Sequence, residues 1–386
     1  MAKEIAYVLI NPYSILKSRT GGILSRLMSR TGLDLVEACL FTPCPELVAA
    51  YAEDVRKHLN GDQAERDILA DYILRAYAPG ADGTRKRVIL LLFEGEQAIE
   101  KIYQATGPLR PGLESGETVR DTYGDLIIAA DGNLVYVEPA VLVGRDRAST
   151  ARALRLWGAY AARDAGLLPP LPVEPGRPES QRTLVLIKCD TFRFPGSRPG
   201  QIVDLFSRSG LRIVGIKVHR MSCREAITFY QPLRDAMGIG LRDQLSREVK
   251  AAISERLGIE LPPELITELS EKIAPIRSEQ QFLQLVGFVT GIRPDQCLEA
   301  DWDRPGEERC LALVYEGPAA VEKIHAILGP ADIAKAGPGT VRRELGAGMM
   351  LHAAHASNTP ESAEREINLI GFRADALSGR IEKYLH

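Results

Sequence analysis

The side chains best suited to chemistry gather late in the chain. Three of the six histidines are His325, His352 and His355. His352 and His355 are three residues apart, at the end of an apolar segment and just before a helix that Pro360 can begin. A histidine at such a junction can be a partly buried structural residue or a functional group. The spacing also suits a pair of metal ligands, but no third Cys, His or carboxylate stands at a recognisable spacing, so we predict no metal site.

Several chemical motifs are absent from the sequence. There is no GxxxxGK[ST] phosphate loop, no HExxH zinc motif and no GxGxxG run after a strand. The six cysteines form no CxxC pair, which indicates reduced thiols and gives little support to a disulfide framework or a zinc site. If the protein handles nucleotides, it does so without a P-loop or a Rossmann turn.

Composition narrows the range of partners and compartments. Lys and Arg together number 48 and Asp and Glu 51, so the net charge is -3. This balance gives no electrostatic basis for general nucleic-acid binding, and we expect no nucleic-acid partner. No apolar run approaches the roughly 18 residues that a membrane helix needs, and the N-terminus lacks the pattern of a signal peptide. We therefore expect a cytoplasmic protein with no membrane partner.

The elements that must position these residues are divided between two domains. A chain of 386 residues is too long for one core, so two domains are expected. A proline-rich stretch, GLLPPLPVEPGRP, cannot form a helix or a central strand and reads as an extended linker. We predict a first domain at 1–165 (the first repeat), a linker at 166–181, and a second domain at 182–386 (the second repeat).

Both repeats show the same order of elements. Each starts with an apolar strand and a helix that ends at a glycine, Gly32 or Gly210. Each later reaches a similar run, at 116–121 and 337–344, before a last strand and helix. This order predicts an α/β (α+β) class of two ferredoxin-like βαββαβ domains, each with an antiparallel four-stranded sheet and helices on one face. The residues at about 234–308 interrupt the second repeat, and we interpret them as a helical insert.

The end of the second repeat resembles the active-site run of the nucleoside diphosphate kinases. The family pattern is N-x-x-H-G-S-D-S followed by S-A-E-x-E-I, and residues 351–367 read LHAAHASNTPESAEREI. Other family motifs occur in the same order. The opening strand ends at Lys188, and the run PGTVR ends at Arg342, 13 residues before His355. The resemblance extends across the second half of the chain, and it implies the ferredoxin-like fold.

The resemblance also implies a mechanism, in which the γ-phosphate of a nucleoside triphosphate passes to a nucleoside diphosphate through a phosphohistidine. It implies that His355 is the nucleophile, and that Glu366 bonds the second ring nitrogen. Ser357 would donate to the leaving phosphate oxygen, and Lys188 and Arg342 would bind the phosphates. Mg²⁺ would bridge the nucleotide phosphates, so no carboxylate cage is expected.

The remaining nucleotide-binding positions implied by the resemblance are Tyr230, His352 and His325. Tyr230 matches a family tyrosine near the nucleophile. His352 stands where the family has Asn, and His325 where it has a phosphate-binding Arg. Ala356 replaces the glycine after the nucleophile, and the family segment with a base-stacking Phe is missing, because the helical insert lies there. These departures remove polar groups around the phosphates.

The first repeat departs further from the family. Asn11 replaces the lysine, Arg120 is kept, and the alignment places Tyr136 at the position of the nucleophile. A phenol has the wrong protonation state for direct attack. We predict a degenerate copy with a structural role. The alternative is a residual nucleotide site around Arg120.

We predict a nucleoside diphosphate kinase-like phosphotransferase whose partners are nucleoside tri- and diphosphates. The resemblance further implies a homo-oligomer. Two alternatives stay open. One is a catalytically weak or inactive nucleotide-binding or scaffold protein. The other is a protein phosphotransferase, which would pass the phosphoryl group from His355 to another protein.

Overall fold

The chain forms two compact units. One unit contains residues 1–218 together with 311–386, and the other contains residues 219–310. The computed structural model describes residues 3–109, 116–129, 134–171, 179–346, 353–373 and 377–385.

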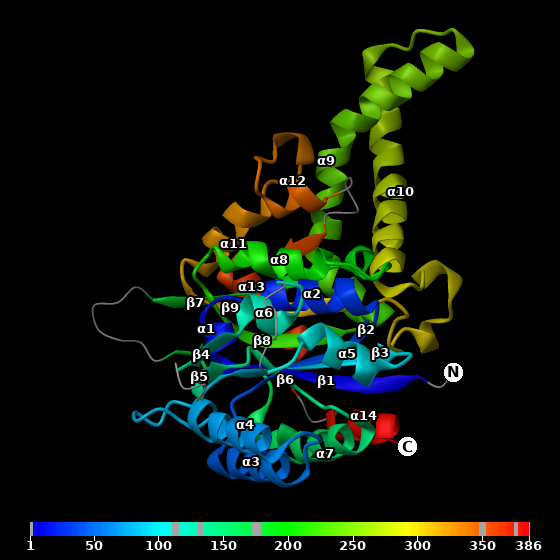
Figure 1. Cartoon of the computed structure of the whole chain (residues 1–386). Helices are drawn as coiled ribbons and strands as arrows, with labels where there is room; N and C mark the ends of the chain where they lie inside the picture. The colour runs from blue at the N-terminus through cyan, green and yellow to red at the C-terminus, as the bar shows by residue number, and fades with distance from the viewer. Residues whose placement is uncertain are drawn as a thin grey trace. The chain divides into compact units, whose positions relative to one another are not determined.

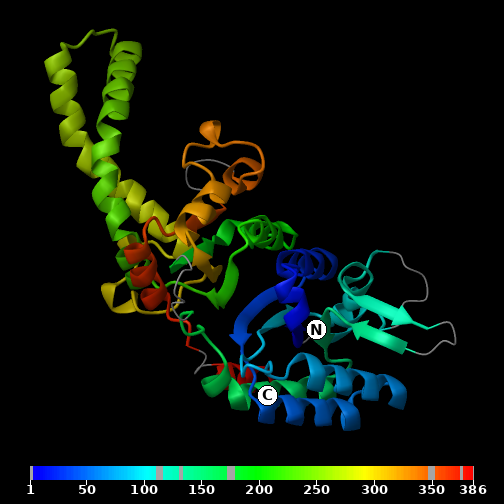
Figure 2. The ribbon, with the colours of Figure 1, turned by 90° about the vertical axis from the view of Figure 1, so that its left-hand side faces the viewer.

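The first repeat supplies one half of a large sheet and the helices around it. Its strands in that sheet are β1 (Glu4–Ile10), β2 (Asp34–Phe41), β3 (Val88–Gly95) and β6 (Val141–Val143). Its helices are α1 (Pro12–Leu16), α2 (Thr20–Thr31), α3 (Pro45–His58), α4 (Gln63–Ala76), α5 (Ala98–Thr106), α6 (Val119–Tyr123) and α7 (Arg147–Asp164). A two-stranded hairpin, seen in Figure 2, consists of β4 (Asp125–Ile128) and β5 (Leu134–Glu138).

The second repeat supplies the other half of the sheet. Its strands are β7 (Ser180–Ile187), β8 (Arg212–His219), β9 (Cys310–Pro318) and β10 (Ala354–Ala356). Its helices outside the insert are α8 (Arg198–Ser207), α11 (Ala320–Leu328), α12 (Val341–Leu345), α13 (Pro360–Ile370) and α14 (Leu377–Leu385). Short 3₁₀ turns lie at Cys189–Thr191, Pro294–Gln296, Glu299–Asp301 and Ile333–Lys335.

The strands of both repeats join in one sheet, with the order β10-β7-β9-β8-β2-β3-β1-β6 among the described residues (Figure 1). β1 pairs antiparallel with β3 and β6, and β7 pairs antiparallel with β9 and β10. The halves meet where Cys39 of β2 pairs with Lys217 of β8. Because the same strand of each repeat forms this junction, an approximate twofold relates the repeats. The predicted pair of ferredoxin-like sheets is confirmed.

Helices cover both faces of the first repeat's sheet (Figure 1). Val8 of β1 shares a core with Ile23 of α2, whereas its neighbour Tyr7 shares a second core with Leu47 of α3 and Trp157 of α7. The prediction of helices on one face is therefore wrong for this repeat. The physical reason is visible in β1, whose continuous apolar run lacks the alternation of a half-exposed strand.

The two repeats are also joined through α2 and α8, which pack closely because each has a glycine at the contact. A Cβ on Gly21 would lie 2.2 Å from the main-chain N of Asp204, and a Cβ on Gly200 would lie 2.2 Å from the main-chain N of Ser25. These distances are far below van der Waals contact. The two contacts are related by the approximate twofold, so this seam is part of the repeat architecture.

The C-terminal helix α14 returns to the first repeat. The hydroxyl of Ser378 donates to the carbonyl of Gly158 in α7 at 2.6 Å, and Arg380 forms an ion pair with Glu37 of β2. The large unit is therefore tied together both at its central strands and by the end of the chain.

The second unit is dominated by two long helices, α9 (Cys223–Leu257) and α10 (Pro263–Thr290). They lie side by side in both ribbon views (Figures 1 and 2). Arg234 and Glu279 form an ion pair between them at 2.6 Å. The predicted helical insert is confirmed. It begins without a break, because α9 runs continuously from the repeat's own second helix into the insert.

Candidate active site

His355 lies in β10, at the edge of the sheet, opposite Leu186 of β7. The strand begins just after Ala353, whose φ of 61° lies in the left-handed region that residues with a Cβ rarely adopt. After the strand, the hydroxyl of Thr359 caps α13 by accepting from the main-chain N of Ser362 at 3.1 Å. This strand–cap–helix path brings a residue of α13 back beside the histidine.

That residue is Glu366, and it holds the imidazole. Nε2 of His355 donates to Oε2 of Glu366 at 3.0 Å, and the hydroxyl of Ser357 donates to the same oxygen at 2.7 Å. Glu366 is 4% exposed, and the side chain of His355 is 21% exposed. The other carboxylate oxygen of Glu366 accepts from Arg365 at 3.3 Å. A buried carboxylate thus orients a ring that remains partly open to solvent.

His325 and Ser357 brace the turn that follows His355. The main-chain carbonyl of Ser357 accepts from Nε2 of His325, in α11, at 2.9 Å. The main-chain N of Ser357 donates to Leu184 at 3.1 Å. The structure thus gives His325 a partner in the backbone beside the histidine.

Two cations lie near this group of side chains. The main-chain N of Lys188 donates to the carbonyl of Ala353 at 2.9 Å. Lys188 continues β7 in extended backbone (φ −76°, ψ 162°), so strand alternation places its side chain on the same face as Leu186, the partner of His355. Burial, together with the positive charge of Arg342, lowers the pKa of Lys188, while Asp190 opposes the change.

Arg342 is fixed at the start of α12. Its Nη1 donates to the carbonyl of Gly329 at 2.7 Å, and burial lowers its pKa. Its Nε is buried with no hydrogen-bond partner among the described residues. Two desolvated cations close enough to repel each other are stabilised when an anion binds between them. The cluster has the charge that a phosphate site needs.

Asp190 is a residue of this cluster that the sequence analysis missed. Its Oδ1 is buried without a hydrogen-bond partner in the described part of the chain, and burial raises the pKa of its carboxyl group. The charge of Lys188 opposes that rise. The run Lys188-Cys-Asp190 was available as a signal, because it places a carboxylate two residues after the lysine.

Two predicted residues, His352 and Tyr230, are not among the described residues of the large unit. His352 lies outside the described residues. Tyr230 is buried in the second unit, where its ring packs edge-on against Phe229 with centroids 4.8 Å apart. The described geometry therefore joins His355, Glu366 and Ser357, with Lys188 beside them.

The first repeat contains a counterpart of each of these elements, and sheet register identifies them. Leu142 of β6 pairs with Leu9 of β1, as His355 pairs with Leu186. Tyr136 instead lies in the β4–β5 hairpin, opposite Ile127. The alignment of Tyr136 with the nucleophile is therefore wrong. It rested on a match to the family's N-x-x-H pattern, and the hairpin shifts the last strand further along the chain.

The counterparts of the other site residues are also changed. Ala140 has a φ of 59° and corresponds to Ala353, and the position of Glu366 is occupied by Ala153. Asn11, at the position of Lys188, accepts from the hydroxyl of Tyr77 at 2.7 Å and is fully buried. A hydrocarbon side chain and a methyl group replace the imidazole and the carboxylate, so this repeat has no nucleophile at the equivalent position.

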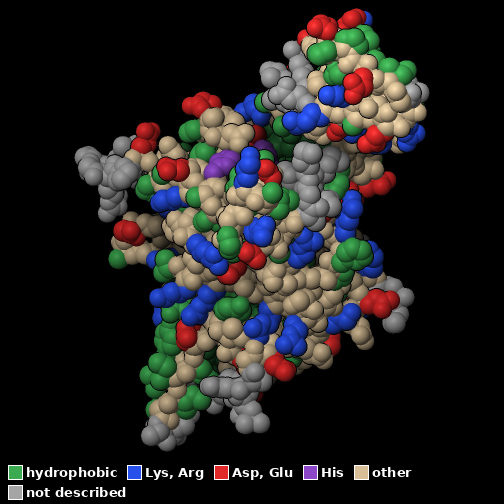
Figure 3. Space-filling model, turned by 90° about the horizontal axis from the view of Figure 1, so that it is seen from above, with side chains coloured by type: hydrophobic (Ala, Val, Ile, Leu, Met, Phe, Trp, Pro, Cys, Tyr) green, Lys and Arg blue, Asp and Glu red, His purple; other side chains and the backbone are tan. Residues whose placement is uncertain are grey.

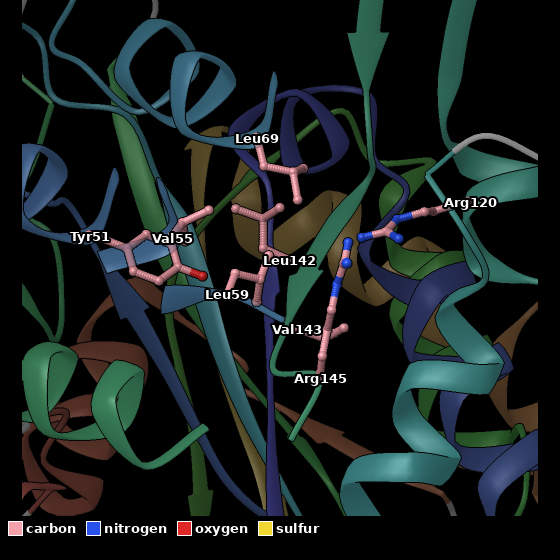
Figure 4. A pocket seen from close by; sticks show the side chains of 8 residues that line it. All are labelled: Tyr51, Val55, Leu59, Leu69, Arg120, Leu142, Val143 and Arg145. Atoms are coloured by element: carbon pink, nitrogen blue, oxygen red, sulfur yellow. The ribbon is translucent and has the colours of Figure 1, made fainter. Parts of the chain in front are cut away.

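Side chains fill the space around Arg120, the counterpart of Arg342 (Figure 4). The remaining cavity is about 10 Å³, at most the volume of one water. Figure 4 shows the guanidinium groups of Arg120 and Arg145 directed toward one another among leucine side chains. Burial and the charge of Arg145 lower the pKa of Arg120 to about 10. Glu65 of α4 pairs with Arg145 at 2.9 Å. Among the described residues, the cavity beside Arg120 is too small for a nucleotide.

Three further features concern surface charge, metal ions and membranes. Basic and acidic side chains are interspersed on the face shown in Figure 3. Within the described ranges, no group of three or more His, Cys, Asp or Glu side chains is arranged to hold a metal ion. No helix in the same ranges is both long and apolar enough to cross a membrane.

Comparisons with known proteins all find nucleoside diphosphate kinases. Residues 305–376 match the family model described as nucleoside diphosphate kinase. The nucleoside diphosphate kinase of Staphylothermus marinus is 26% identical over 198 residues, which cover 51% of this chain and 96% of that protein. The enzyme of Thermobifida fusca is 30% identical over 135 residues, which cover 34% of this chain and 87% of that protein.

A crystal structure of an NDP kinase from Pyrobaculum aerophilum is 23% identical, covering 50% of this chain and 95% of that one, with a TM-score of 0.33. The resemblance seen in the sequence is confirmed by the relatives that align over most of their length. This chain belongs to the nucleoside diphosphate kinase family.

Proposed function

We propose that the second repeat moves the γ-phosphate of a nucleoside triphosphate to a nucleoside diphosphate through a phosphohistidine at His355. The observation that carries this proposal is the bond of 3.0 Å between Nε2 of His355 and the buried carboxylate of Glu366. With the proton on Nε2 directed at Glu366, the lone pair of the imidazole is on Nδ1. That nitrogen is the nucleophile in the proposed step.

In the first half-reaction, Nδ1 of His355 forms a bond to the γ-phosphorus while the bond to the bridging β-oxygen breaks. The nucleoside diphosphate leaves with the electrons of that bond. The ring becomes positively charged, and the carboxylate of Glu366 stabilises it through Nε2–H. The second half-reaction is the reverse with another nucleoside diphosphate, which regenerates neutral imidazole.

The phosphate charge is met by Lys188 and Arg342 in this proposal. Their lowered pKa values mean that each is a cation with little solvent to stabilise it, so an anionic ligand relieves that cost. Mg²⁺ enters as part of the substrate, bound to the nucleotide phosphates, and this role needs no dedicated carboxylate cage. Asp190 is two residues after Lys188, and its negative charge raises the pKa of that lysine. The carboxylate can therefore hold the ammonium group in position.

Incubation with ATP labelled at the γ-phosphate tests the proposal. The full chain should take up one acid-labile phosphate and release it to added GDP or CDP. His355→Ala should take up none, while the matched control His58→Ala, at the exposed end of α3, should behave as the unchanged protein. Label that survives His355→Ala would refute the site.

The same experiment separates the alternatives. A scaffold would bind nucleotide and stay unlabelled. A protein phosphotransferase would label at His355 but discharge poorly to diphosphates and readily to a protein acceptor. Rapid discharge to GDP or CDP is the result expected for the proposed function.

The proposal includes a homo-oligomer in the cytoplasm. Family membership supports the assembly, and sedimentation velocity would measure it. Among the described residues, which include all six cysteines, no cysteine is in a disulfide, and this supports a reducing compartment.

A further inference from the structure

A cavity lies where the two repeats meet within the large unit, away from His355. Its volume is about 160 Å³, enough for several water molecules or for one phosphate-sized group with a small substituent. The first repeat lines it with Thr20 and Arg87, and the second with Arg212 and Tyr315. Leu16, which is 72% exposed, also lines it, so the cavity reaches the surface.

Two buried hydroxyl groups line this cavity without a hydrogen-bond partner among the described residues. Thr20 is 4% exposed and Tyr315 is 1% exposed, and neither Oγ1 of the first nor the phenol oxygen of the second is bonded. An unsatisfied buried hydroxyl costs free energy, and such groups in native proteins call for a ligand or an ordered water. These two groups come from different repeats and line one space.

The charge lining the cavity is positive. Arg87 and Arg212 line it, and none of the described residues that line it is acidic. Burial, with the charge of Arg212, lowers the pKa of Arg87 to about 10. The nearby carboxylate is Glu316, which lies 3.5 Å from Arg212 but is already paired with Arg182 at 2.9 Å. One carboxylate thus faces three guanidinium groups, which leaves excess positive charge beside the cavity.

Three of the four polar residues named above have no hydrogen-bond donor as their counterpart across the approximate twofold. Sheet register makes Phe93 the counterpart of Tyr315, since each precedes the Glu-Gly end of its strand. Asp34 corresponds to Arg212, because each follows the leucine after the glycine that ends the preceding helix. The symmetric glycine contacts make Pro199 the counterpart of Thr20. The related position therefore has none of these three donors.

We infer that this cavity binds a small phosphate-bearing molecule. Arg87 and Arg212 supply charge and paired N–H donors, and the hydroxyls of Thr20 and Tyr315 supply two further donors from opposite walls. Donors from several directions suit a tetrahedral oxyanion better than a planar carboxylate. Because both repeats contribute, the bound anion would also strengthen the contact between them.

Calorimetric titration of the full chain with inorganic phosphate and with pyrophosphate tests this inference. The titration uses the Lys188→Met background, which removes a cation from the proposed catalytic site. Thr20→Val and Tyr315→Phe should each weaken binding about 10-fold, the effect of one hydrogen bond to a charged group. The matched control is Thr106→Val, since Thr106 is also buried with an unbonded hydroxyl but does not line the cavity.

Urea unfolding shows whether Thr20→Val and Tyr315→Phe still fold. Neither hydroxyl has a bond to lose in the protein alone, so the urea midpoint without phosphate should not fall. Binding that is equally tight in both variants and in the control would overturn the inference, and so would malonate binding as tightly as phosphate. Absence of any phosphate binding would leave a water-filled cavity only, and would also overturn it. The kinase reaction in the unaltered background is measured separately, so failure here leaves the proposed function intact.

Discussion

Leu142 in the first repeat occupies the position that His355 occupies in the second. Each is the middle residue of a three-residue edge strand, and each faces a leucine of the repeat's first strand. The two positions thus have the same backbone environment, but one has a hydrocarbon side chain and the other an imidazole. This relationship shows which residue of the first repeat replaces the proposed nucleophile, a residue that the sequence motif alone did not identify.

Restoring the histidine should not restore phosphoryl transfer in the first repeat. In Leu142→His/His355→Ala, Ala153 supplies no carboxylate, Asn11 supplies no charge, and the space beside Arg120 is filled. We expect no acid-labile label from γ-labelled ATP. Leu142→His alone should retain a single label, at His355. Label in the double variant would show that the first repeat binds nucleotide despite its packing.

Glu366→Gln should slow transfer with little effect on nucleotide affinity. Gln can accept from Ser357 and His355, but it has no charge to stabilise the ring once it is phosphorylated. We expect kcat to fall about 100-fold and KM to change little. Glu364→Gln is the matched control, because Glu364 lies exposed on the same helix. Equal rates for the two variants would remove Glu366 from its positioning role.

Much of the fold followed from sequence pattern because the same elements recur in both repeats. The strand, helix and glycine order around Gly32 and Gly210 was sufficient for the βαββαβ arrangement. The spacing between His355 and Glu366 was also informative, since a short strand, a cap and two helical turns return the carboxylate to the ring. Local sequence pattern was enough to predict the structure wherever a family motif fixed the alignment of the chain.

The remaining features depended on tertiary packing. No polar residue marks Leu142, so only pairing with β1 reveals its position. The continuous apolar run of β1 contained the signal for helices on both faces, but it did not say which helices would cover them. In the first repeat, the packing around Arg120 depends on Glu65, which pairs with Arg145. Glu65 comes from α4, a helix distant in sequence, so local pattern did not reveal it.

Lys188→Met should stabilise the protein while it reduces transfer. Burial lowers the pKa of Lys188, so the folded chain releases this proton at lower pH than the unfolded chain. Between the two pKa values the unfolded chain binds more protons, and the stability of the unchanged protein rises with pH. At neutral pH the buried charge is a cost, and its removal should raise the free energy of unfolding by on the order of 1 kcal/mol.

Urea unfolding at a series of pH values measures this effect. The difference between Lys188→Met and the unchanged protein should narrow as the pH approaches about 10.4, the ordinary value for lysine. Lys57→Met, at an exposed position of α3, should show no comparable difference. A variant less stable than the unchanged protein at neutral pH would mean that the ammonium group is fully compensated in the fold.

Gly200→Ala should weaken the seam between the repeats. Alanine normally stabilises a helix relative to glycine, by about 0.5–1 kcal/mol. At Gly200 the added Cβ would lie 2.2 Å from the main-chain N of Ser25, so α2 and α8 must separate, at a cost of about 1–3 kcal/mol. The matched control is Gly379→Ala in α14, where nothing lies within 4 Å of the added atom. Urea unfolding should give opposite signs for the two substitutions, whereas stabilisation by both would show that the helices can move apart without loss.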